Sequence, residues 1–256
     1  MDNLLKSTDA ARLLGVAPST IKRWADEGRL PHVKTAGGHR RFRQSDVAAF
    51  SSGEPDAASA WANVLLRSQN PFSLRSELLS LRARTNSWCE AADEIGGALA
   101  EIGLRWRRGE LSIHEEHLAT ENLKRGVASC ADAIPIARDA RRCVLVVAEG
   151  DEHTLGLSLL EVCLRELGWS TPWLGRQTPL KTLVSFVAAT SPDAVAISAS
   201  AFSQNPESLR HIAAVLSDAC KASSTSLILG GSGSWPTDLK HGHRLTSFQE
   251  LGLLTI

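Results

Sequence analysis

The sequence predicts a multidomain protein in which helical domains precede a parallel α/β domain. Three observations support this fold class. The chain has 256 residues, more than the usual ~100–200 of one domain. From about residue 56 to 134 the apolar residues recur with helical periodicity. From residue 141 onward, short apolar runs alternate with helical stretches, which is typical of a parallel sheet flanked by helices.

Turn-favouring residues divide the chain into three predicted domains. The first covers residues 1–52, and the small residues of 51–55 predict a hinge after it. The second covers residues 56–135 and is predicted to be a four-helix bundle. The third, residues 140–256, holds the α/β pattern. Its expected strands are Cys143–Ala148, Trp173–Leu174, Ala194–Ile197, Ser226–Leu229 and a fifth candidate at Leu251–Ile256.

Breaks and caps define the helices of the bundle. Asn70-Pro71 and the region around Gly109 interrupt the helical periodicity. The expected N-cap residues are Ser73, Ser87 and Ser112. Two of these serines have a glutamate three residues later, which is the capping-box spacing.

Composition excludes several classes of protein. A hydrophobic fraction of 43% and a charged fraction of 22% are those of an ordinary globular protein. No run approaches the ~20 apolar residues of a membrane span, and Met1 to Lys6 lacks a signal-peptide core. The cysteines are odd in number and scattered, which argues against a disulfide framework or a structural zinc site. We therefore expect a cytoplasmic protein.

Charge is unevenly distributed along a chain whose formal net charge is zero. Residues 1–50 carry nine Lys/Arg against five Asp/Glu, a net charge of +4, so the remainder carries −4. A basic head on an acidic body predicts that the head meets a polyanion.

The basic head has helix-turn-helix spacing. Thr8–Leu14 predicts a short helix, Gly15–Ala17 a tight turn, and Pro18–Glu27 a second helix that begins with proline. The second helix would offer four polar side chains to a DNA major groove: Ser19, Thr20, Lys22 and Arg23.

A hairpin is predicted directly after these helices. Gly37 and Gly38 permit a tight turn at its tip, and His39, Arg40 and Arg41 follow. Arginines at this place would grip phosphates without reading sequence. Turn, helix and hairpin in this order resemble the winged-helix head of MerR-type regulators, whose wing commonly reads Gly-Gly-His-Arg. The resemblance implies binding to double-stranded operator DNA; a helical module whose arginines are merely solvated is the alternative.

The loop after the first strand of the α/β domain carries a candidate metal ligand. It reads Glu-Gly-Asp-Glu-His-Thr-Leu-Gly over residues 149–156 and opens a helix. In open α/β sheets, ligands bind at the carboxyl ends of the strands. The neutral imidazole of His153 can donate to a transition metal, while Asp151 holds the other ring nitrogen. Gly156 would let a flat ligand approach the backbone. An isolated loop histidine is otherwise an ordinary surface residue.

The spacing of Asp151, His153 and Gly156 resembles the Asp-x-His-x-x-Gly pattern of base-off, His-on cobalamin-binding domains, which have a Rossmann-like fold. Residues 168–169 and 174–179 resemble the second strand and the following helix start of such domains. The resemblance implies that His153 ligates cobalt. It also implies that small residues after the third and fourth strands line the slot for the displaced nucleotide tail: Ser198, Ser200, Gly230 and Gly231. The family often has Ser-x-Leu where this chain has Ser200, so the tail contacts differ in detail. An α/β domain that binds another ligand is the alternative.

A third motif lies in the predicted helical bundle. Trp106 is followed after nine residues by Glu116-His117. Composition alone would favour a core tryptophan with exposed helix charges. The spacing, however, resembles a motif of the CarH/LitR photoreceptor group of MerR-type repressors. There the bundle caps the upper face of cobalamin, the tryptophan packs over the 5′-deoxyadenosyl group, and the Glu-His pair contacts it.

One position departs from that family. Its best-known members have a histidine directly after the tryptophan, which ligates cobalt after illumination, whereas this chain has Arg107. A guanidinium stays protonated and cannot serve as that ligand. His114, His117 or a water molecule remain as alternatives, and a second chromophore such as a bilin is not excluded.

Together the motifs predict a light-responsive transcriptional regulator, not an enzyme. Adenosylcobalamin is the expected cofactor, and operator DNA and further copies of the chain, as a dimer or tetramer, are the expected partners. Two alternatives remain open: a regulator that senses cobalamin without light, and a corrinoid carrier for methyl transfer. The sequence shows neither a nucleophilic serine elbow nor a phosphate-cradling loop with lysine.

Overall fold

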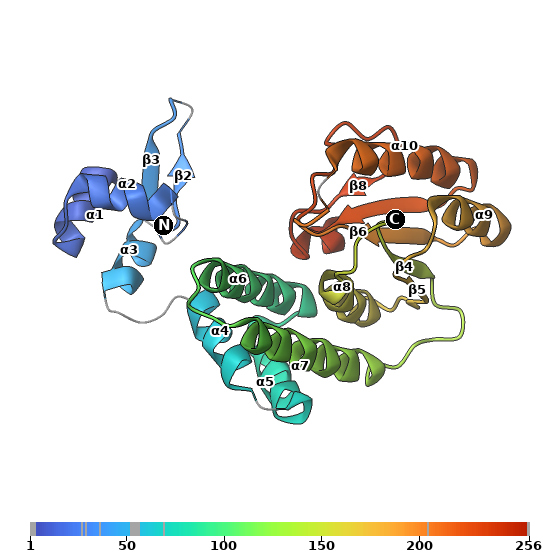
Figure 1. Ribbon diagram of the computed structural model, residues 1–256, viewed down its shortest axis with the longest axis horizontal. Coiled ribbons are helices and arrows are strands. Elements are labelled where there is room, and N and C mark those ends of the chain that lie inside the picture. Colours follow the sequence, from blue (N-terminus) through green and yellow to red (C-terminus); the bar gives the residue numbers. More distant parts are fainter. Residues whose placement is uncertain are drawn as a thin grey trace. The chain divides into compact units, whose positions relative to one another are not determined.

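The computed structural model describes residues 4–26, 28, 30–35, 37–51, 57–68, 70–203 and 205–254. The chain divides into two compact units, Met1–Trp61 and Ala62–Ile256, each of which is described by itself (Figure 1). Most of the predicted hinge, residues 52–55, lies outside the described residues.

The first unit is a small α/β head. Its elements are β1 (Leu4–Lys6), α1 (Ser7–Leu14), α2 (Pro18–Asp26), β2 (Val33–Lys34), β3 (Arg40–Arg43) and α3 (Gln44–Ser51). Gly15 ends α1 in the left-handed conformation at φ 66°, which produces the predicted turn. The core consists of side chains from all three helices, from β3 and from the segment between α2 and β2: Ala10, Ala11, Ile21, Ala25, Leu30, Phe42 and Val47.

The predicted hairpin is present as an antiparallel pair, β2 with β3. Gly38 has φ 75°, and its N–H donates to the Thr35 carbonyl at 2.8 Å, so the turn needs a residue without a Cβ. Strand β1 was not predicted; it pairs with β3 on the other side and completes a three-stranded sheet of order β1-β3-β2.

The four predicted bundle helices are α4 (Ala57–Arg67), α5 (Pro71–Thr85), α6 (Trp88–Arg107) and α7 (Ile113–Asp132). Ser87 and Ser112 are N-caps as predicted, and Ser112 forms a capping box with Glu115. The prediction of Ser73 as an N-cap was wrong. Asn70 caps α5 instead, because its side chain accepts from the Ser73 N–H at 2.9 Å and Pro71 occupies the first helical position.

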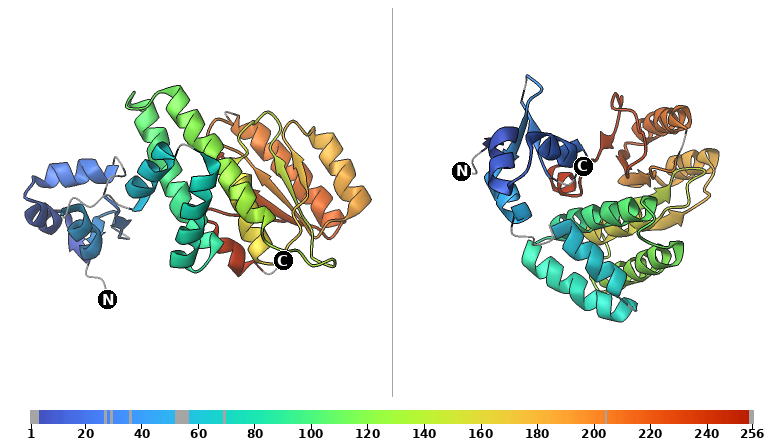
Figure 2. Two further views of the ribbon diagram at one scale, coloured as in Figure 1. Left: turned by 90° about the horizontal axis from the view of Figure 1, so that it is seen from below. Right: turned by 60° about the vertical axis from the view of Figure 1, so that its left-hand side comes forward.

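The α/β part contains a five-stranded parallel sheet. Its elements are β4 (Cys143–Val147), α8 (Leu155–Glu166), β5 (Trp173–Gly175), α9 (Leu180–Thr190), β6 (Ala194–Ser198), α10 (Pro206–Ala222), β7 (Ser226–Gly230), β8 (His243–Arg244) and the 3₁₀-helix η1 (Gln249–Leu253). The strand order is β5-β4-β6-β7-β8. Helices α9 and α10 cover one face, and α8 lies on the other, in contact with α6 and α7 (Figures 1 and 2).

The predicted fifth strand at Leu251–Ile256 was wrong. Residues 249–253 form η1, and residues 255–256 lie outside the described part. Leu251 is buried but Leu253 is 82% exposed, so this segment offers one apolar side chain to the core and not the face of a strand. Strand β8 takes the edge position, where His243 and Arg244 pair with Ile228 and Leu229.

Partly buried carboxylates link the bundle to the α/β part. The Glu166 carboxylate, at the end of α8, accepts from the Trp88 N–H at 2.7 Å and from the Arg82 guanidinium. Asp93 of α6 accepts from the backbone N–H groups of Phe248 and Gln249, at 2.7 and 3.2 Å. Among the described helices, none has the length and apolarity that a membrane crossing requires.

Candidate functional site

The direction in which the chain winds along the sheet reverses between the carboxyl ends of β4 and β6, the position at which open α/β sheets have a crevice. After β4 the chain turns to α8 on one face of the sheet, and after β6 it turns to α10 on the other. At such a reversal the two loops separate, and open α/β sheets bind ligands there. The predicted ligand loop, residues 149–156, follows β4, and Ser198 and Ser200 end or follow β6.

The loop after β4 fixes the orientation of the His153 imidazole. Its Nδ1 lies 2.8 Å from Asp151 Oδ1 and 3.1 Å from Ser200 Oγ. The backbone N–H of His153 also donates to Asp151, at 2.9 Å. The other ring nitrogen, Nε2, makes no hydrogen bond within the described ranges, and the side chain is 55% exposed. With a proton on Nδ1 shared with the carboxylate, Nε2 presents a lone pair to solvent.

Asp151 is a buried carboxylate, and it is kept ionised. Burial alone would raise the pKa of Asp151, but hydrogen bonds from Ser203, from the Ser200 N–H and from His153 together hold this pKa well below its usual range. The carboxylate is therefore available as an acceptor for the imidazole N–H at any ordinary pH.

Two residues of this arrangement were not predicted. Ser203 donates to Asp151, and the Phe202 ring stacks on the His153 ring with centroids 5.1 Å apart and 12° between planes. Both lie in the loop after β6. The Ser200 hydroxyl, which accepts from the Phe202 N–H at 3.2 Å, holds this loop beside the imidazole.

A cavity of about 370 Å³ opens beside this loop. It is lined by four of the predicted cofactor residues: Gly156, Ser198, Gly230 and Gly231. Sequence reasoning missed the rest of its wall. This comprises Asp93, Gly96 and Gly97 of α6, the C-terminal residues 245–248, and five residues of the α/β part: Leu157, Leu160, Ile197, Ile228 and Ser232. Ser200 does not line the cavity and contacts the imidazole instead.

The cavity walls fit a flat ligand with a hydrogen-bonding edge. A Cβ at Gly231 would lie 2.2 Å from the Ala199 carbonyl oxygen, so only glycine fits there. A Cβ at Gly156 would lie 3.5 Å from Ser198 Oγ. Ser198 is 7% exposed, and its hydroxyl has no hydrogen-bond partner in the described part of the chain. This hydroxyl is not one of the fully buried polar atoms without a partner, and Ser198 lines the cavity, so the hydroxyl is free to hydrogen-bond a ligand there.

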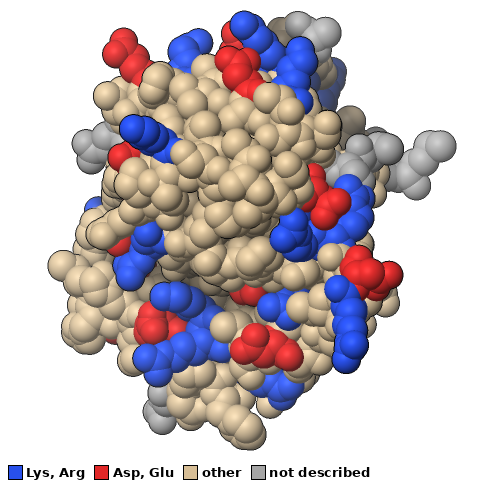
Figure 3. Space-filling view, turned by 90° about the vertical axis from the view of Figure 1, so that its right-hand side faces the viewer, with Lys and Arg blue, Asp and Glu red and all other residues tan. Residues whose placement is uncertain are grey.

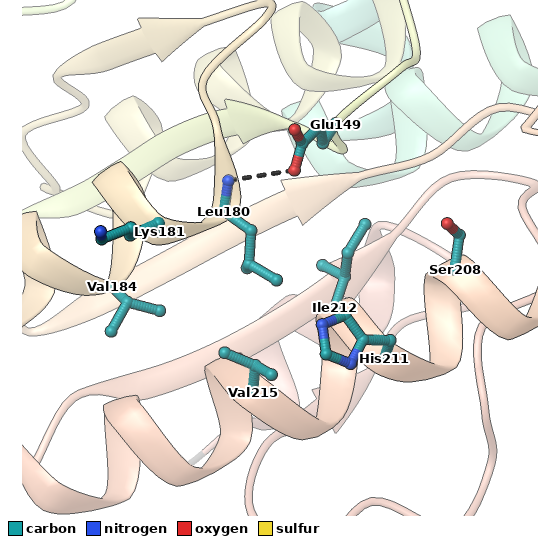
Figure 4. A pocket seen from close by; sticks show the side chains of 8 residues that line it. All are labelled: Glu149, Leu180, Lys181, Val184, Ser208, His211, Ile212 and Val215. Atoms are coloured by element: carbon teal, nitrogen blue, oxygen red, sulfur yellow. Dashed lines mark hydrogen bonds between the residues drawn. The ribbon is translucent and has the colours of Figure 1, made fainter.

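A second hollow, between α9 and α10, holds none of the predicted cofactor residues (Figure 4). It has a volume of about 520 Å³, and the side chains of Leu180, Val184 and Ile212 line it. The Leu180 N–H donates to Glu149 at 3.1 Å, which fixes the start of α9 (Figure 4). The side of the molecule on which α9 lies carries few charges over its middle (Figure 3). Among the residues that line this hollow, no imidazole is hydrogen-bonded to a carboxylate as His153 is to Asp151. The crevice beside His153 is therefore the better candidate for a cofactor that contains a metal.

The predicted capping residues lie at one end of the bundle. Trp106 is in the last turn of α6 and is 38% exposed, and Glu116 and His117 are in the first turns of α7. His117 Nε2 lies 3.5 Å from Glu116 Oε2. Among the described residues, no hydrogen bond or ion pair joins these three side chains to Asp151 or His153.

In the head, the predicted DNA-binding residues fall on α2 and the hairpin. On α2, Ser19, Lys22 and Arg23 are exposed, and Thr20 is half-buried. A hollow of about 450 Å³ brings Lys22 together with His39, Arg40 and Arg41. Its remaining wall was not predicted and consists of Lys6, Ser7, Thr8 and Gly38. The hollow therefore joins cations from three elements.

Arg40 is held by the head itself. Its guanidinium forms an ion pair with Asp26, at the end of α2, and its side chain is 26% exposed. The Arg41 guanidinium donates to the Arg40 carbonyl at 3.1 Å. Arg40 therefore ties the hairpin to the second helix, a contact that the spacing of the motif did not predict.

Comparison with known proteins matches both the head and the larger unit to families. Residues 4–52 match a family model described as a helix-turn-helix domain, and residues 141–239 and 91–130 match two described as B12 binding domains. The HTH-type transcriptional repressor CarH of Myxococcus xanthus is 27% identical over 196 residues, which are 75% of this chain and 58% of CarH. The repressor CarA of the same organism is 32% identical over 137 residues, 53% of this chain and 44% of CarA. The chain resembles a CarH-type regulator. It spans about half the length of these CarH-type relatives.

A solved structure shares the fold of the larger unit. The monomethylamine corrinoid protein of Methanosarcina barkeri superimposes with a TM-score of 0.58 at 14% identity, over 76% of this chain and 94% of that protein. This likeness shows the fold alone: a helical bundle followed by a parallel α/β domain. This chain thus joins a helix-turn-helix domain to a fold shared with a corrinoid protein.

Proposed function

We propose that this protein is a light-responsive transcriptional regulator that binds adenosylcobalamin and, through its head, operator DNA. Its domains would be a winged helix-turn-helix at residues 1–52, a capping bundle at 56–135 and a cobalamin-binding domain at 140–256. One observation carries the proposal: in a chain with a helix-turn-helix head, the His153 imidazole presents Nε2 at the crevice while Asp151 holds Nδ1.

The residues take distinct roles in this proposal. His153 would ligate cobalt through Nε2, with Asp151 and Ser200 fixing the ring. The nucleotide tail would enter the cavity lined by Gly156, Ser198 and the neighbouring glycines, Gly230 and Gly231. Trp106, Glu116 and His117 would cover the upper face. When bound, adenosylcobalamin supplies a cobalt–carbon bond that visible light cleaves.

The state of the cofactor would change DNA binding by the head through a change in oligomeric state. A homo-oligomer, dimer or tetramer, carries several heads, and several heads bind repeated half-sites more tightly than one because the second contact is intramolecular. If the contact of the cap residues with the bound cofactor stabilises the dark-state oligomer, loss of that contact after illumination changes the number of chains in the oligomer. DNA affinity and cofactor state are then thermodynamically linked. Since operator DNA lies in the cytoplasm of a bacterium, this function would require a cytoplasmic regulator.

The decisive experiment is size-exclusion chromatography with absorbance spectra on protein loaded with adenosylcobalamin, in darkness and after green light. We expect a spectral change together with a change in assembly size. A spectral change at constant size would overturn the assembly route, and the absence of bound cobalamin would overturn the proposal.

Two other functions rest on specific observations. Arg107 follows Trp106 where a light-exposed cobalt would need a ligand, which favours a regulator that senses cobalamin without light. Such a regulator would bind DNA equally in darkness and light at saturating cobalamin. The fold shared with a corrinoid protein favours a methyl carrier, in which case methyl transfer from a donor to the bound corrinoid would be measurable.

A further inference from the structure

Helix α6 contains two consecutive glycines, Gly96 and Gly97, in the middle of its 20 residues. Glycine is among the least favourable residues for a helix interior because it loses the most backbone entropy on folding. Two adjacent glycines in the middle of α6 therefore lower the stability of this helix, and some other advantage must offset that loss.

Neither conformation nor packing within the chain provides that reason for Gly96. It is absent from the residues with positive φ, so its backbone suits any amino acid. A Cβ built at Gly96 meets no atom within 4 Å. Two glycines of the same unit are confined by packing instead: a Cβ at Gly126 lies 3.1 Å from Leu78, and one at Gly231 lies 2.2 Å from a carbonyl oxygen. Gly103 of α6 also meets no atom within 4 Å, but it does not line the cavity that Gly96 lines. Gly96 faces open space.

That space belongs to the cavity beside the His153 loop. Gly96 and Gly97 line it, as does Ser198, whose nearly buried hydroxyl has no partner among the described residues. The cavity thus combines two independent features that suit a ligand: a hydroxyl of a nine-tenths buried serine that has no protein partner, and a stretch of helix backbone without side chains.

The walls around these glycines are held in place. Asp93, one turn before Gly96 on α6, accepts from the backbone N–H groups of Phe248 and Gln249, so the C-terminal wall is fixed to the helix. Strand β6 forms the floor with Ile197 and Ser198. Because hydrogen bonds hold these elements together, the space beside Gly96 has fixed walls.

The size and lining of the cavity suggest which part of cobalamin would occupy it. About 370 Å³ is near the lower end of the volumes of small-molecule sites, enough for a nucleotide base but not for a whole corrinoid. The apolar lining includes Leu157, Leu160 and Ile228, which suits a flat aromatic group, and the Ser198 hydroxyl suits its polar edge.

We infer that Gly96 and Gly97 are specificity-determining residues of the cobalamin site: they leave the backbone of α6 bare so that the bicyclic base of the nucleotide tail fits against it. This inference rests on the proposed function. It assigns to the bundle a part in selecting the lower base of the corrinoid, in addition to the covering of its upper face.

The test is a leucine at position 96. Gly96→Leu is compared with Ala188→Leu, which adds a larger apolar side chain at an exposed position of α9, away from the cavity. The affinities of both variants and of the unaltered protein are measured by absorbance titration with cobalamin and with cobinamide, which keeps the corrin but lacks the nucleotide tail. Overfilling a packed site costs enough to weaken cobalamin binding by about tenfold or more in Gly96→Leu. Ala188→Leu should bind as the unaltered protein does.

The outcomes separate the inference from the proposed function. A loss in Gly96→Leu that is confined to cobalamin supports the inference. Unchanged cobalamin affinity, or an equal loss for cobinamide, overturns it while the proposed function stands. If the unaltered protein binds no cobalamin, the proposed function fails as well. Folding is checked by the melting temperature of the cofactor-free protein and by Gly96→Ala, which should melt higher because alanine favours a helix, yet bind cobalamin more weakly.

Discussion

The position of a single proton decides what His153 can do. Nδ1 faces the Asp151 carboxylate at 2.8 Å, and the pKa of that carboxyl is held low by Ser203 and by backbone N–H groups. An ionised acceptor at this distance keeps the imidazole proton on Nδ1. Nε2 therefore carries the lone pair that a metal ligand needs, and the stacked Phe202 ring limits rotation of the imidazole.

We predict that His153→Ala weakens cobalamin binding by about tenfold or more, within the 10–100-fold range typical of altered metal environments. The absorbance spectrum of any cobalamin that remains bound should change, since the nitrogen below cobalt is lost. Both are measured by titration with cobalamin. His211→Ala, in the hollow between α9 and α10, is the control and should leave affinity and spectrum unchanged. Equal behaviour of the two variants would remove His153 as the cobalt ligand.

Local motifs explain which site residues were predictable. Asp151, His153 and Gly156 lie within six residues, so their spacing alone indicates a shared site. Ser203 joins Asp151 across 52 positions, and Asp93 joins Phe248 across 155. Contacts over such separations depend on how whole elements pack, which periodicity and spacing do not encode.

At the scale of elements, the head depends on the contact between α2 and the hairpin. The ion pair of Arg40 with Asp26 holds β3 beside the end of α2. Lys22 and Arg41 then face the same hollow. A helix for the major groove and a hairpin for the phosphates are useful together only when their spacing is fixed, so Arg40 acts both as a cation and as a tie.

We predict that Arg40→Ala combined with Arg41→Ala lowers affinity for operator and unrelated DNA alike. Phosphate contacts carry no sequence information, and losing two should make the dependence of log K on log salt shallower by about 2. Fluorescence anisotropy at several salt concentrations measures both quantities. Arg125→Ala, exposed on α7, is the matched control for loss of a surface arginine. If only operator binding fell, the hairpin would read bases and its assignment to phosphates would be wrong.

Elements differed in how well their patterns predicted them. The four bundle helices and four of the five strands of the large sheet lie where the sequence pattern placed them. Strands β4, β6 and β7 were predictable because their apolar runs are buried, whereas β5 is only partly buried. Strand β1 and strand β8 were missed, since Leu4–Lys6 and His243–Arg244 are short edge segments with little apolar patterning. The apolar run at 251–256 was misassigned because hydrophobicity alone does not distinguish a strand from a packed turn.

At the scale of the whole molecule, most of the bundle and the α/β part form one compact unit, and the head with the start of α4 forms another. Glu166 and Asp93 tie the bundle to the sheet domain by hydrogen bonds to Trp88 and Phe248. The two parts proposed to enclose the cofactor are therefore connected before it binds. A ligand of that unit should stabilise both parts together and leave the head unaffected.

This division predicts how cobalamin changes thermal unfolding. A ligand that binds only the folded state adds RT ln(1 + [L]/Kd), about 2.7 kcal/mol at a free concentration of 100 Kd. We expect two calorimetric transitions in the cofactor-free protein, of which cobalamin raises only the larger, that of residues 62–256. In His153→Ala the same cobalamin concentration should give a much smaller shift, since stabilisation falls as Kd rises. A single transition, or an equal rise of both, would mean that the head and the cofactor unit unfold as one, in which case the cofactor state would reach the head within a single chain and would need no change in assembly.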